Sequence, residues 1–460
     1  MRDEQPIIGR DAELTSLQQR YDRPGSQLVL VYGRRRIGKS FLLEKFAQGK
    51  PAVFYQATQQ TESAELETFT RTVQPTVGGE YLPTGYSFPS WEAALTFLSE
   101  RHRGARRLLV ILDEFPYLAA ATNGLPSIVQ RWWDQHGRHS NIMLVLCGSE
   151  QRFMEDLDGV AAPLHQRFTA KLHILPLGYR DAARFTPALD AADKARVYAV
   201  LGGTPLYLRQ WNSEATFRDN LLTLFGDPAS SLVDSAEIIL STDLEDARGP
   251  YRALQAVALG ATKHSEIRDR AKISTDRTIQ RLLGLQLLEK RVPATDHPER
   301  SRRSIYAVAD PYFRFYFRFI AINRGAIDRG LGEQVIDNSI LPFFDTYMGF
   351  AFEDIARAFA RYLIVRGELE GDDVGSWWST DGQHEIDIVG TAALRPTFIG
   401  SVKWRADALG EEVLRDLERD AIALGIGADT PRLLIGRGGI RAELIGRRGL
   451  RGFSADDLYR

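Results

Sequence analysis

Short, continuous runs of apolar residues recur through the first 175 residues of the chain, and helical patterns separate them. The runs are QLVLV at 27–31, LLVIL at 108–112 and IMLVL at 142–146, with a shorter one at 53–55. Buried parallel strands have such sequences because helices cover both faces of their sheet. The pattern predicts a doubly wound α/β domain with a parallel sheet over residues 1–175.

The pattern changes three times in the rest of the chain. Residues 176–247 are mainly helical. Residues 248–325 contain three short helical stretches, then two β-type segments around a polar turn, an order typical of a winged helix-turn-helix with its recognition helix near 274–283. Residues 326–460 mix helices and strands and predict a further α/β domain.

The strongest chemical signal lies in the turn after the first predicted strand. Gly33 to Ser40 reads GRRRIGKS, which fits G-x-x-x-x-G-K-[ST] between a strand and a helix. Glycines allow the tight turn that directs several backbone N–H groups at one anion. The motif predicts an ATP site in which Lys39 meets the β- and γ-phosphates and the Ser40 hydroxyl ligates Mg²⁺. The other expected nucleotide contacts are Arg36, Ile37, Gly38 and Phe41.

An acidic pair follows the apolar run at 108–112. The strand would carry Asp113 to the sheet edge beside the phosphate loop, where its carboxylate completes Mg²⁺ coordination through water. Glu114 is placed to orient and deprotonate an attacking water, which predicts hydrolysis as well as binding. A strand that ends in Asp-Glu is also common as a structural feature, so this interpretation depends on the phosphate loop. Within that loop we expect Arg34 and Arg35 to face solvent or another domain.

These motifs together resemble the archaeal-type ATPase family within the AAA+/STAND P-loop NTPases. The resemblance implies that the leading sequence IIGRDAEL packs near the adenine, through Gly9, Arg10 and Glu13. It also implies a sensor role for Ser149, in the sequence CGSE after the fourth strand, where a small polar side chain would touch the γ-phosphate or its water.

Two further positions rest on the same resemblance. The sequence GGTP is similar to an element of a helical lid, with Gly203 and a base contact by Pro205. Arg167 stands where such proteins carry an arginine that reaches a phosphate. For Arg167, a surface salt bridge is the open alternative.

The winged-helix segment has two interpretations. It carries polar residues suited to duplex DNA on its recognition helix and wing. Alternatively, the winged helix is an internal lid that reports the nucleotide state to the rest of the chain, and the net charge of −2 does not decide between them. The candidate DNA contacts are Ser274, Thr275, Arg277, Thr278, Arg281, Arg300, Arg302 and Arg303.

The sequences HEIDIVG and FIGSVKW look like the core of a PD-(D/E)XK nuclease, which the ATPase family often carries at its C-terminus. The resemblance implies that Asp387 helps to hold Mg²⁺ and that Lys403 assists the water nucleophile. The acidic ligand expected two residues before the lysine is replaced by Ser401. Glu385, on the same strand face, or Glu353 from the preceding helix would have to compensate. We therefore expect a degenerate nuclease-like domain.

Length and composition limit the remaining possibilities. A chain of 460 residues is too long for one hydrophobic core. The single cysteine, Cys147, excludes an internal disulfide and a cysteine zinc site. The chain lacks an apolar run of membrane-spanning length and begins with a polar segment, so we expect a cytoplasmic protein without a membrane partner.

The sequence thus predicts an α/β protein with a doubly wound P-loop NTPase sheet at 1–175, a helical lid at 176–247, a winged helix-turn-helix at 248–325 and a C-terminal α/β nuclease-like domain at 326–460. We expect a Mg²⁺-dependent AAA+/STAND ATPase that is gated by ATP and ADP and associated with duplex DNA. An ATP-gated signalling switch or scaffold, and an ATP-regulated metal-dependent nuclease, are the alternatives. A homo-oligomer or a protein partner is compatible with each.

Overall fold

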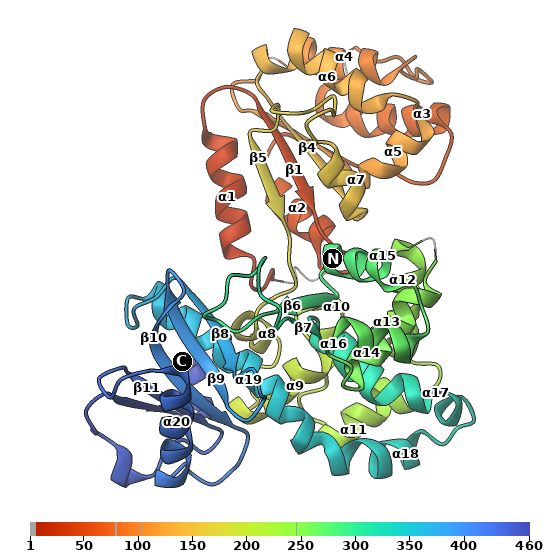
Figure 1. Cartoon of the computed structure of the whole chain (residues 1–460). Coiled ribbons are helices and arrows are strands. Elements are labelled where there is room, and N and C mark those ends of the chain that lie inside the picture. Colours follow the sequence, from red (N-terminus) through yellow and green to blue (C-terminus); the bar gives the residue numbers. More distant parts are fainter. Residues whose placement is uncertain (1–5, 79–80, 103, 245) are drawn as a thin grey trace. The chain divides into compact units, whose positions relative to one another are not determined.

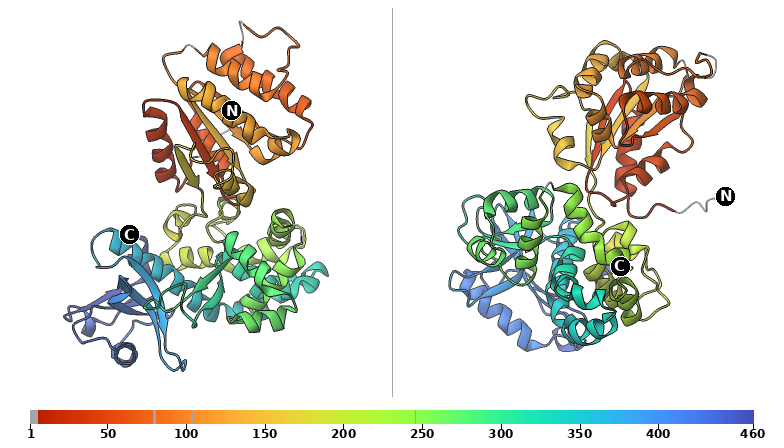
Figure 2. Two further views of the ribbon diagram at one scale, coloured as in Figure 1. Left: turned by 45° about the horizontal axis from the view of Figure 1, so that its top comes forward. Right: turned by 90° about the vertical axis from the view of Figure 1, so that its right-hand side faces the viewer.

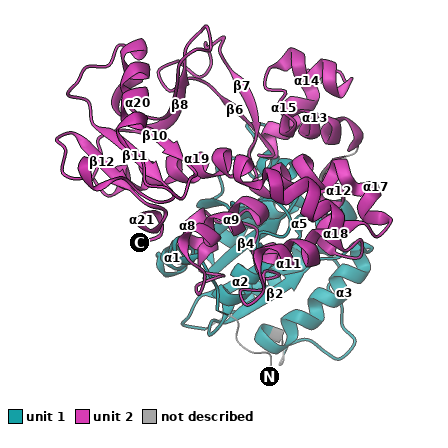
Figure 3. Ribbon diagram, turned by 90° about the horizontal axis from the view of Figure 1, so that it is seen from below, with its two compact units in different colours: residues 1–176 teal, residues 177–460 magenta. Residues whose placement is uncertain are grey.

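The computed structural model describes residues 6–78, 81–102, 104–244 and 246–460. The chain divides into two compact units (Figure 3). Unit 1 comprises residues 1–176 and unit 2 comprises residues 177–460. In the described part of the chain, none of the helices combines the length and the apolar character that a bilayer span requires.

Unit 1 is built on a five-stranded parallel sheet (Figure 1), as the apolar runs predict. The order is β2-β3-β4-β1-β5, and every neighbouring pair is parallel. The strands are β1 (Gln27–Tyr32), β2 (Ala52–Gln56), β3 (Leu108–Asp113), β4 (Ile142–Gly148) and β5 (Ala170–His173).

Helices cover both faces of this sheet because alternate strand residues point to opposite sides. Leu28 and Leu30 contribute to the core under α3, α4 and α6, whereas Val29 and Val31 contribute to the core under α1 and α2. The doubly wound α/β class predicted from the sequence is therefore confirmed. The helices are α1 (Asp11–Asp22), α2 (Lys39–Ala47), α3 (Glu62–Val73), α4 (Trp91–Arg101), α5 (Phe115–Ala121), α6 (Leu125–Gln135) and α7 (Gln151–Asp156).

Unit 2 begins with a helical part whose core contains many aromatic side chains. The aromatic-rich segment after Asp310 is helical, and Tyr312, Phe315 and Tyr316 are fully buried in it. The helices are α8 (Tyr179–Ala183), α9 (Ala191–Leu201), α10 (Pro205–Leu208), α11 (Phe217–Leu221), α12 (Ser231–Asp243), α16 (Pro311–Phe315), α17 (Ala321–Asp328), α18 (Gly332–Val335) and α19 (Leu341–Val365).

Three helices and a hairpin interrupt this part in the order expected of a winged helix-turn-helix. They are α13 (Arg248–Ala258), α14 (His264–Ala271), α15 (Thr275–Gly284) and the antiparallel pair β6 (Leu288–Arg291) and β7 (Ile305–Val308). The loop between β6 and β7 contacts the next strand, β8 (Asp373–Trp378). The backbone N–H of Ala294 donates to Ser376 O at 2.8 Å, and Arg303 donates to Trp378 O at 2.7 Å.

A second, mixed sheet completes unit 2, in the order β12-β11-β10-β9-β8. Strands β8 to β10 are antiparallel, and β10 to β12 are parallel. Helix α19 packs on one face of this sheet and α20 on the other (Figure 2). The remaining elements are β9 (Glu385–Ala392), β10 (Arg395–Lys403), α20 (Glu411–Leu424), β11 (Arg432–Gly436), β12 (Leu450–Phe453) and α21 (Ala455–Tyr459).

Candidate nucleotide site and acidic cluster

Three strands of unit 1 bring the predicted nucleotide residues to one edge of the sheet. Strand β4 lies between β1 and β3, with Tyr32 opposite Gly148 and Leu112 opposite Leu146. The loop after β1, Ser149 after β4, and Asp113 at the end of β3 therefore emerge side by side. Ligands of open α/β sheets bind outside the carboxyl ends of the strands, where these residues lie.

The phosphate loop has the tight geometry that its glycines predict. Gly33 has a φ of +150°, and a Cβ at that position would lie 2.2 Å from Ile174 O, so a larger residue would clash with the backbone. Gly38 is left-handed, with a φ of +89°, and precedes the first residue of α2. Arg36 adopts a φ of +69°, which is uncommon for a residue with a side chain. The loop thus directs the start of α2, with Ser40 and Phe41 in its first turn, at this sheet edge.

A chain of hydrogen bonds joins three of the predicted residues. The buried Lys39 ammonium donates to Gly33 O, Arg34 O and Ser149 Oγ, each at 2.9 Å. Ser149 is also buried, and its hydroxyl donates to Glu114 Oε1 at 2.9 Å. Ser149 therefore links the phosphate-loop lysine to the acidic pair.

Asp113 offers an oxygen atom that the described residues do not satisfy. Its side chain is fully buried, and Oδ1 accepts the Glu114 N–H at 3.1 Å. Among the described residues, Oδ2 has no hydrogen-bond partner. Because a buried, unpaired carboxylate oxygen is costly, a cation at this position would stabilise the site. Asp113 Oδ2 and the Ser40 hydroxyl are hard oxygen donors of the type that Mg²⁺ prefers, so these residues fit that metal.

Glu114 has an unusual backbone conformation. It precedes α5 with a φ of +53°, in the left-handed region that is uncommon for a residue with a side chain. Residues held in such conformations cluster at functional sites, where the surrounding structure maintains them.

Cys147, in β4, is a core residue, as expected. Burial raises the pKa of its thiol well above the ordinary value, and the charge of Asp113 adds to this effect.

The leading motif of the chain supports the phosphate loop directly. Arg10 is buried and donates to Ile37 O at 3.0 Å and to Leu175 O at 2.8 Å, while it pairs with Glu13 at 2.7 Å. Gly9, just before it, is left-handed. Motif residues expected near the adenine therefore also hold the loop in place, a structural role that the sequence did not reveal.

Of the two expectations for Arg34 and Arg35, exposure to solvent does not hold for Arg34, and contact with another domain stays a prediction. Arg34 is buried, and half-buried Arg35 donates to the Tyr117 hydroxyl at 3.1 Å. Arg167 forms a salt bridge, which was the alternative to a phosphate contact for this residue. Its guanidinium binds both carboxylate oxygens of Asp134 and two backbone carbonyls, and the hydrogen bond from Arg167 lowers the pKa of Asp134.

The two lid positions lie in unit 2. A Cβ at Gly203 would lie 1.9 Å from Leu177 O, so glycine is required by the close approach of these backbones. Pro205 is the first residue of α10. A base contact by Pro205 stays a prediction.

The predicted nuclease-like residues gather between α19, β9 and β10. Asp387 Oδ2 accepts hydrogen bonds from Val402 N at 2.7 Å, Ser401 Oγ at 3.1 Å and Lys403 Nζ at 3.3 Å. Ser401 stands at the position where the nuclease pattern has an acidic ligand. Its hydroxyl donates to Asp387, whereas a carboxylate at this position would repel that aspartate.

Two further carboxyl groups stand near Asp387. Burial raises the pKa of Glu353 to about 8, and the charges of Asp387 and Glu385 act in the same direction. Yet among the described residues there is no group of three or more His, Cys, Asp or Glu side chains arranged to hold a metal ion. Compensation by Glu353 or Glu385 in a nuclease site stays a prediction.

A half-buried ionic cluster, which residue patterns did not predict, lies beside these residues. Asp354 pairs with Arg291 at 2.8 Å, Arg314 at 2.6 Å and Arg357 at 2.5 Å. Burial acts to raise the pKa of Asp354, but the three arginines outweigh it and hold this pKa well below its usual range. The signal in the sequence is the charged pair Glu353-Asp354, followed by Arg357, within the largely apolar pattern of α19.

Comparisons with known proteins bear on both units. Residues 7–211 match a family model described as an ATPase domain predominantly from Archaea. The match is in keeping with the phosphate loop and the acidic pair, both of which lie inside it. Residues 316–416 match a family of archaeal and bacterial proteins of unknown function.

The individual relatives span most of the chain. An uncharacterised protein of Methanocaldococcus jannaschii is 26% identical over 91% of this chain and 93% of its own length. Among solved structures, a Walker-type ATPase of Pyrococcus abyssi is 18% identical, with a TM-score of 0.49, and covers 69% of this chain and 99% of its own. The ORC2 protein of Aeropyrum pernix is 16% identical, with a TM-score of 0.42, and its match covers 73% of this chain and 96% of its own length.

Proposed function

We propose that unit 1 binds ATP with Mg²⁺ and hydrolyses its γ-phosphate. The observation that carries this proposal is the hydrogen-bonded chain from Lys39 through Ser149 to Glu114, beside the unsatisfied oxygen of Asp113. Binding of phosphate without hydrolysis requires only the loop and its lysine. A carboxylate held by the sensor serine at the same edge adds a base for the attacking water.

In this mechanism the loop and the start of α2 bind the phosphates through backbone N–H groups. Lys39 exchanges its bonds to Gly33 O and Arg34 O for phosphate oxygens, where its charge stabilises the transition state. Ser40 and Asp113 would hold Mg²⁺, which neutralises charge on the β- and γ-phosphates. The Ser149 hydroxyl orients the Glu114 carboxylate, which takes the proton of the water during in-line attack.

Replacing the buried lysine tests nucleotide binding. We expect Lys39→Ala to weaken ATP affinity by about 10- to 100-fold, because it removes a charge-assisted hydrogen bond to phosphate. Isothermal titration calorimetry with ATP and Mg²⁺ measures the change. The matched control is Lys45→Ala, in the last turn of the same helix, which should bind ATP as the unmodified protein does. Equal affinities for both variants would refute the site.

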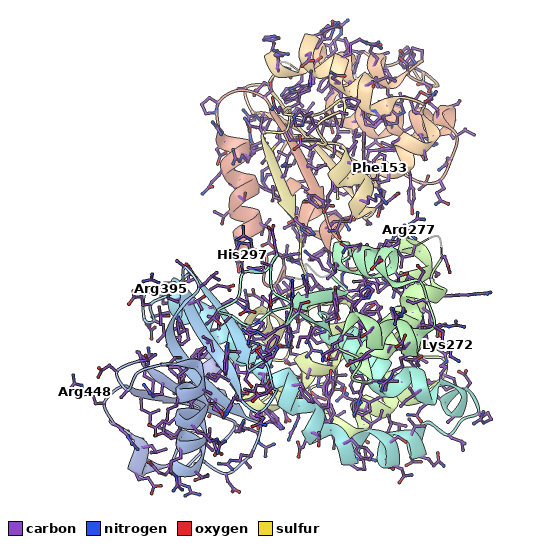
Figure 4. All side chains as sticks on the ribbon, in the orientation of Figure 1. Phe153, Lys272, Arg277, His297, Arg395 and Arg448 are labelled. Carbon is purple, nitrogen blue, oxygen red and sulfur yellow. The ribbon has the colours of Figure 1, made fainter. Side chains whose placement is uncertain are left out.

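A second proposal is association with duplex DNA through α15. Arg277 is exposed on this helix (Figure 4), and Arg300 and Arg302 are exposed on the wing. Arg303, in contrast, is held by Asp296 and Trp378 O, so we leave it out of the proposed surface. The side chain of Thr275, another candidate contact, lies outside the described residues. The contact of the wing with β8 favours the internal-lid alternative for the wing itself.

The DNA proposal predicts that Arg277→Ala lowers both the affinity for duplex DNA and its dependence on salt. Loss of one phosphate contact should reduce the slope of log K against log[salt] by about 1. Fluorescence anisotropy at several salt concentrations measures this slope, with Arg252→Ala, an exposed arginine on α13, as the control. No DNA binding, together with an ATP-dependent change in mass, would favour the signalling switch.

A further inference from the structure

A cavity of about 580 Å³ lies within unit 2, apart from the phosphate loop. Its walls come from α13, the β6–β7 hairpin, α19, and the strands β8 and β9. The hydrogen bond from Ala294 to Ser376 and the ion pair between Arg291 and Asp354 hold these elements together. The volume is within the range of small-molecule sites in proteins, about 300–1,000 Å³.

Aromatic side chains form much of the cavity wall. Phe343, Tyr347 and Phe350 line it from α19 at helical spacing, and Tyr306 and Trp378 line it from β7 and β8. Phe343 and Phe350 are 56% and 64% exposed. Large apolar side chains left in contact with water at a concave surface are typical of ligand sites, because a bound ring would cover them.

Charged side chains form another part of the cavity wall, and several of them are held by ion pairs. Arg291, Arg314 and Arg357 line it while they are bound to Asp354, and Glu353 and Glu385 add carboxyl groups. The exposed Arg318 also lines the cavity, and its guanidinium forms no ion pair or hydrogen bond with the described residues. Its guanidinium is therefore available to an anion from outside.

We propose that this cavity binds a nucleotide unit, a planar base that carries a phosphate. Aromatic rings stack on any of the bases, because every base has a flat π-face. Carboxyl groups such as those of Glu353 and Glu385 accept hydrogen bonds from the amino groups of a base edge. Arg318 pairs with the phosphate as a planar, bidentate donor. The unit is either a free nucleotide or the end of a single strand, since both present this chemistry.

The test uses the full chain with a non-hydrolysable ATP analogue added in excess to fill the phosphate-loop site. AMP, GMP, CMP and UMP are then titrated by calorimetry, followed by single-stranded pentanucleotides. We expect at least one monophosphate to bind, and Arg318→Ala and Phe350→Ala each to weaken that binding by about tenfold. Higher affinity for the pentanucleotides would identify a strand end as the ligand, and equal affinity a free nucleotide.

Matched controls keep this result interpretable. Arg329→Ala removes an exposed arginine of the neighbouring helical segment, and Ile322→Ala removes an exposed apolar side chain of α17, and neither residue lines the cavity. Both should bind as the unmodified protein does. Because Arg318 and Phe350 are exposed, their variants should fold normally. The proposal fails if no probe binds at millimolar concentration, or if all four variants bind alike.

Discussion

Glu114→Gln should abolish most ATP turnover while leaving ATP binding close to normal. The amide keeps the size of the carboxylate, and its oxygen can still accept the hydrogen bond from Ser149 Oγ. It cannot take a proton from water. Loss of a general base costs about 10²- to 10⁴-fold in rate, so turnover should fall by that factor. The phosphate loop and Lys39 are untouched, so affinity should change little.

Steady-state phosphate release and calorimetric ATP binding are measured on the same preparation. Glu150→Gln is the control, because Glu150 is exposed and follows Ser149 in the chain. Its turnover should match that of the unmodified protein. A Glu114→Gln variant that hydrolyses ATP within threefold of the normal rate would remove Glu114 from the mechanism, because another group would then have to accept the proton of the water.

The nucleotide site was predictable from sequence to the extent that it depends on local patterns. Strand, glycine turn and helix follow one another between Gln27 and Ala47, and each is encoded by its own residues. The acidic pair was found because β3 is a continuous apolar run. That Ser149 lies between Lys39 and Glu114 follows from the strand order, in which β4 lies between β1 and β3.

Sequence patterns do not indicate which of several distant partners a side chain contacts after folding. Arg167 lies 33 positions from Asp134, and Arg34 lies in a motif whose pattern says nothing of burial. A single sequence shows the charge of an arginine but not the carboxylate that meets it after folding. The same limit hid Asp354, whose three partners come from β6, α16 and α19 itself.

The role of Arg10 illustrates the same limit within a recognised motif. The resemblance placed the leading sequence near the adenine, but the guanidinium of Arg10 bonds to the backbones of the phosphate loop and of the segment after β5. A motif found by resemblance therefore carries structural contacts as well as ligand contacts. Only the folded chain separates the two, because both require the same residue at the same position.

Asp354→Asn should destabilise the contact between the β6–β7 hairpin and α19. The half-buried aspartate lies among Arg291, Arg314 and Arg357, and the amide keeps its shape but not its charge. Three guanidinium groups would then lack their shared counter-ion. Breaking a fully buried charge pair costs about 3–5 kcal/mol, and because these groups are partly exposed we expect a loss of about 1–3 kcal/mol. Because Arg291 belongs to β6 and Asp354 to α19, the loss should loosen the contact of the hairpin with the C-terminal sheet.

Hydrogen exchange followed by mass spectrometry localises this effect. Amides of β6 and α19 should exchange faster, with an opening free energy lower by about 1–3 kcal/mol, while β1 and β3 of unit 1 keep their protection. Asp373→Asn is the control, since its side chain is 74% exposed and lies 3.5 Å from Arg361. If both variants exchange alike, Asp354 does not hold the hairpin, and the walls of the cavity are maintained by apolar packing instead.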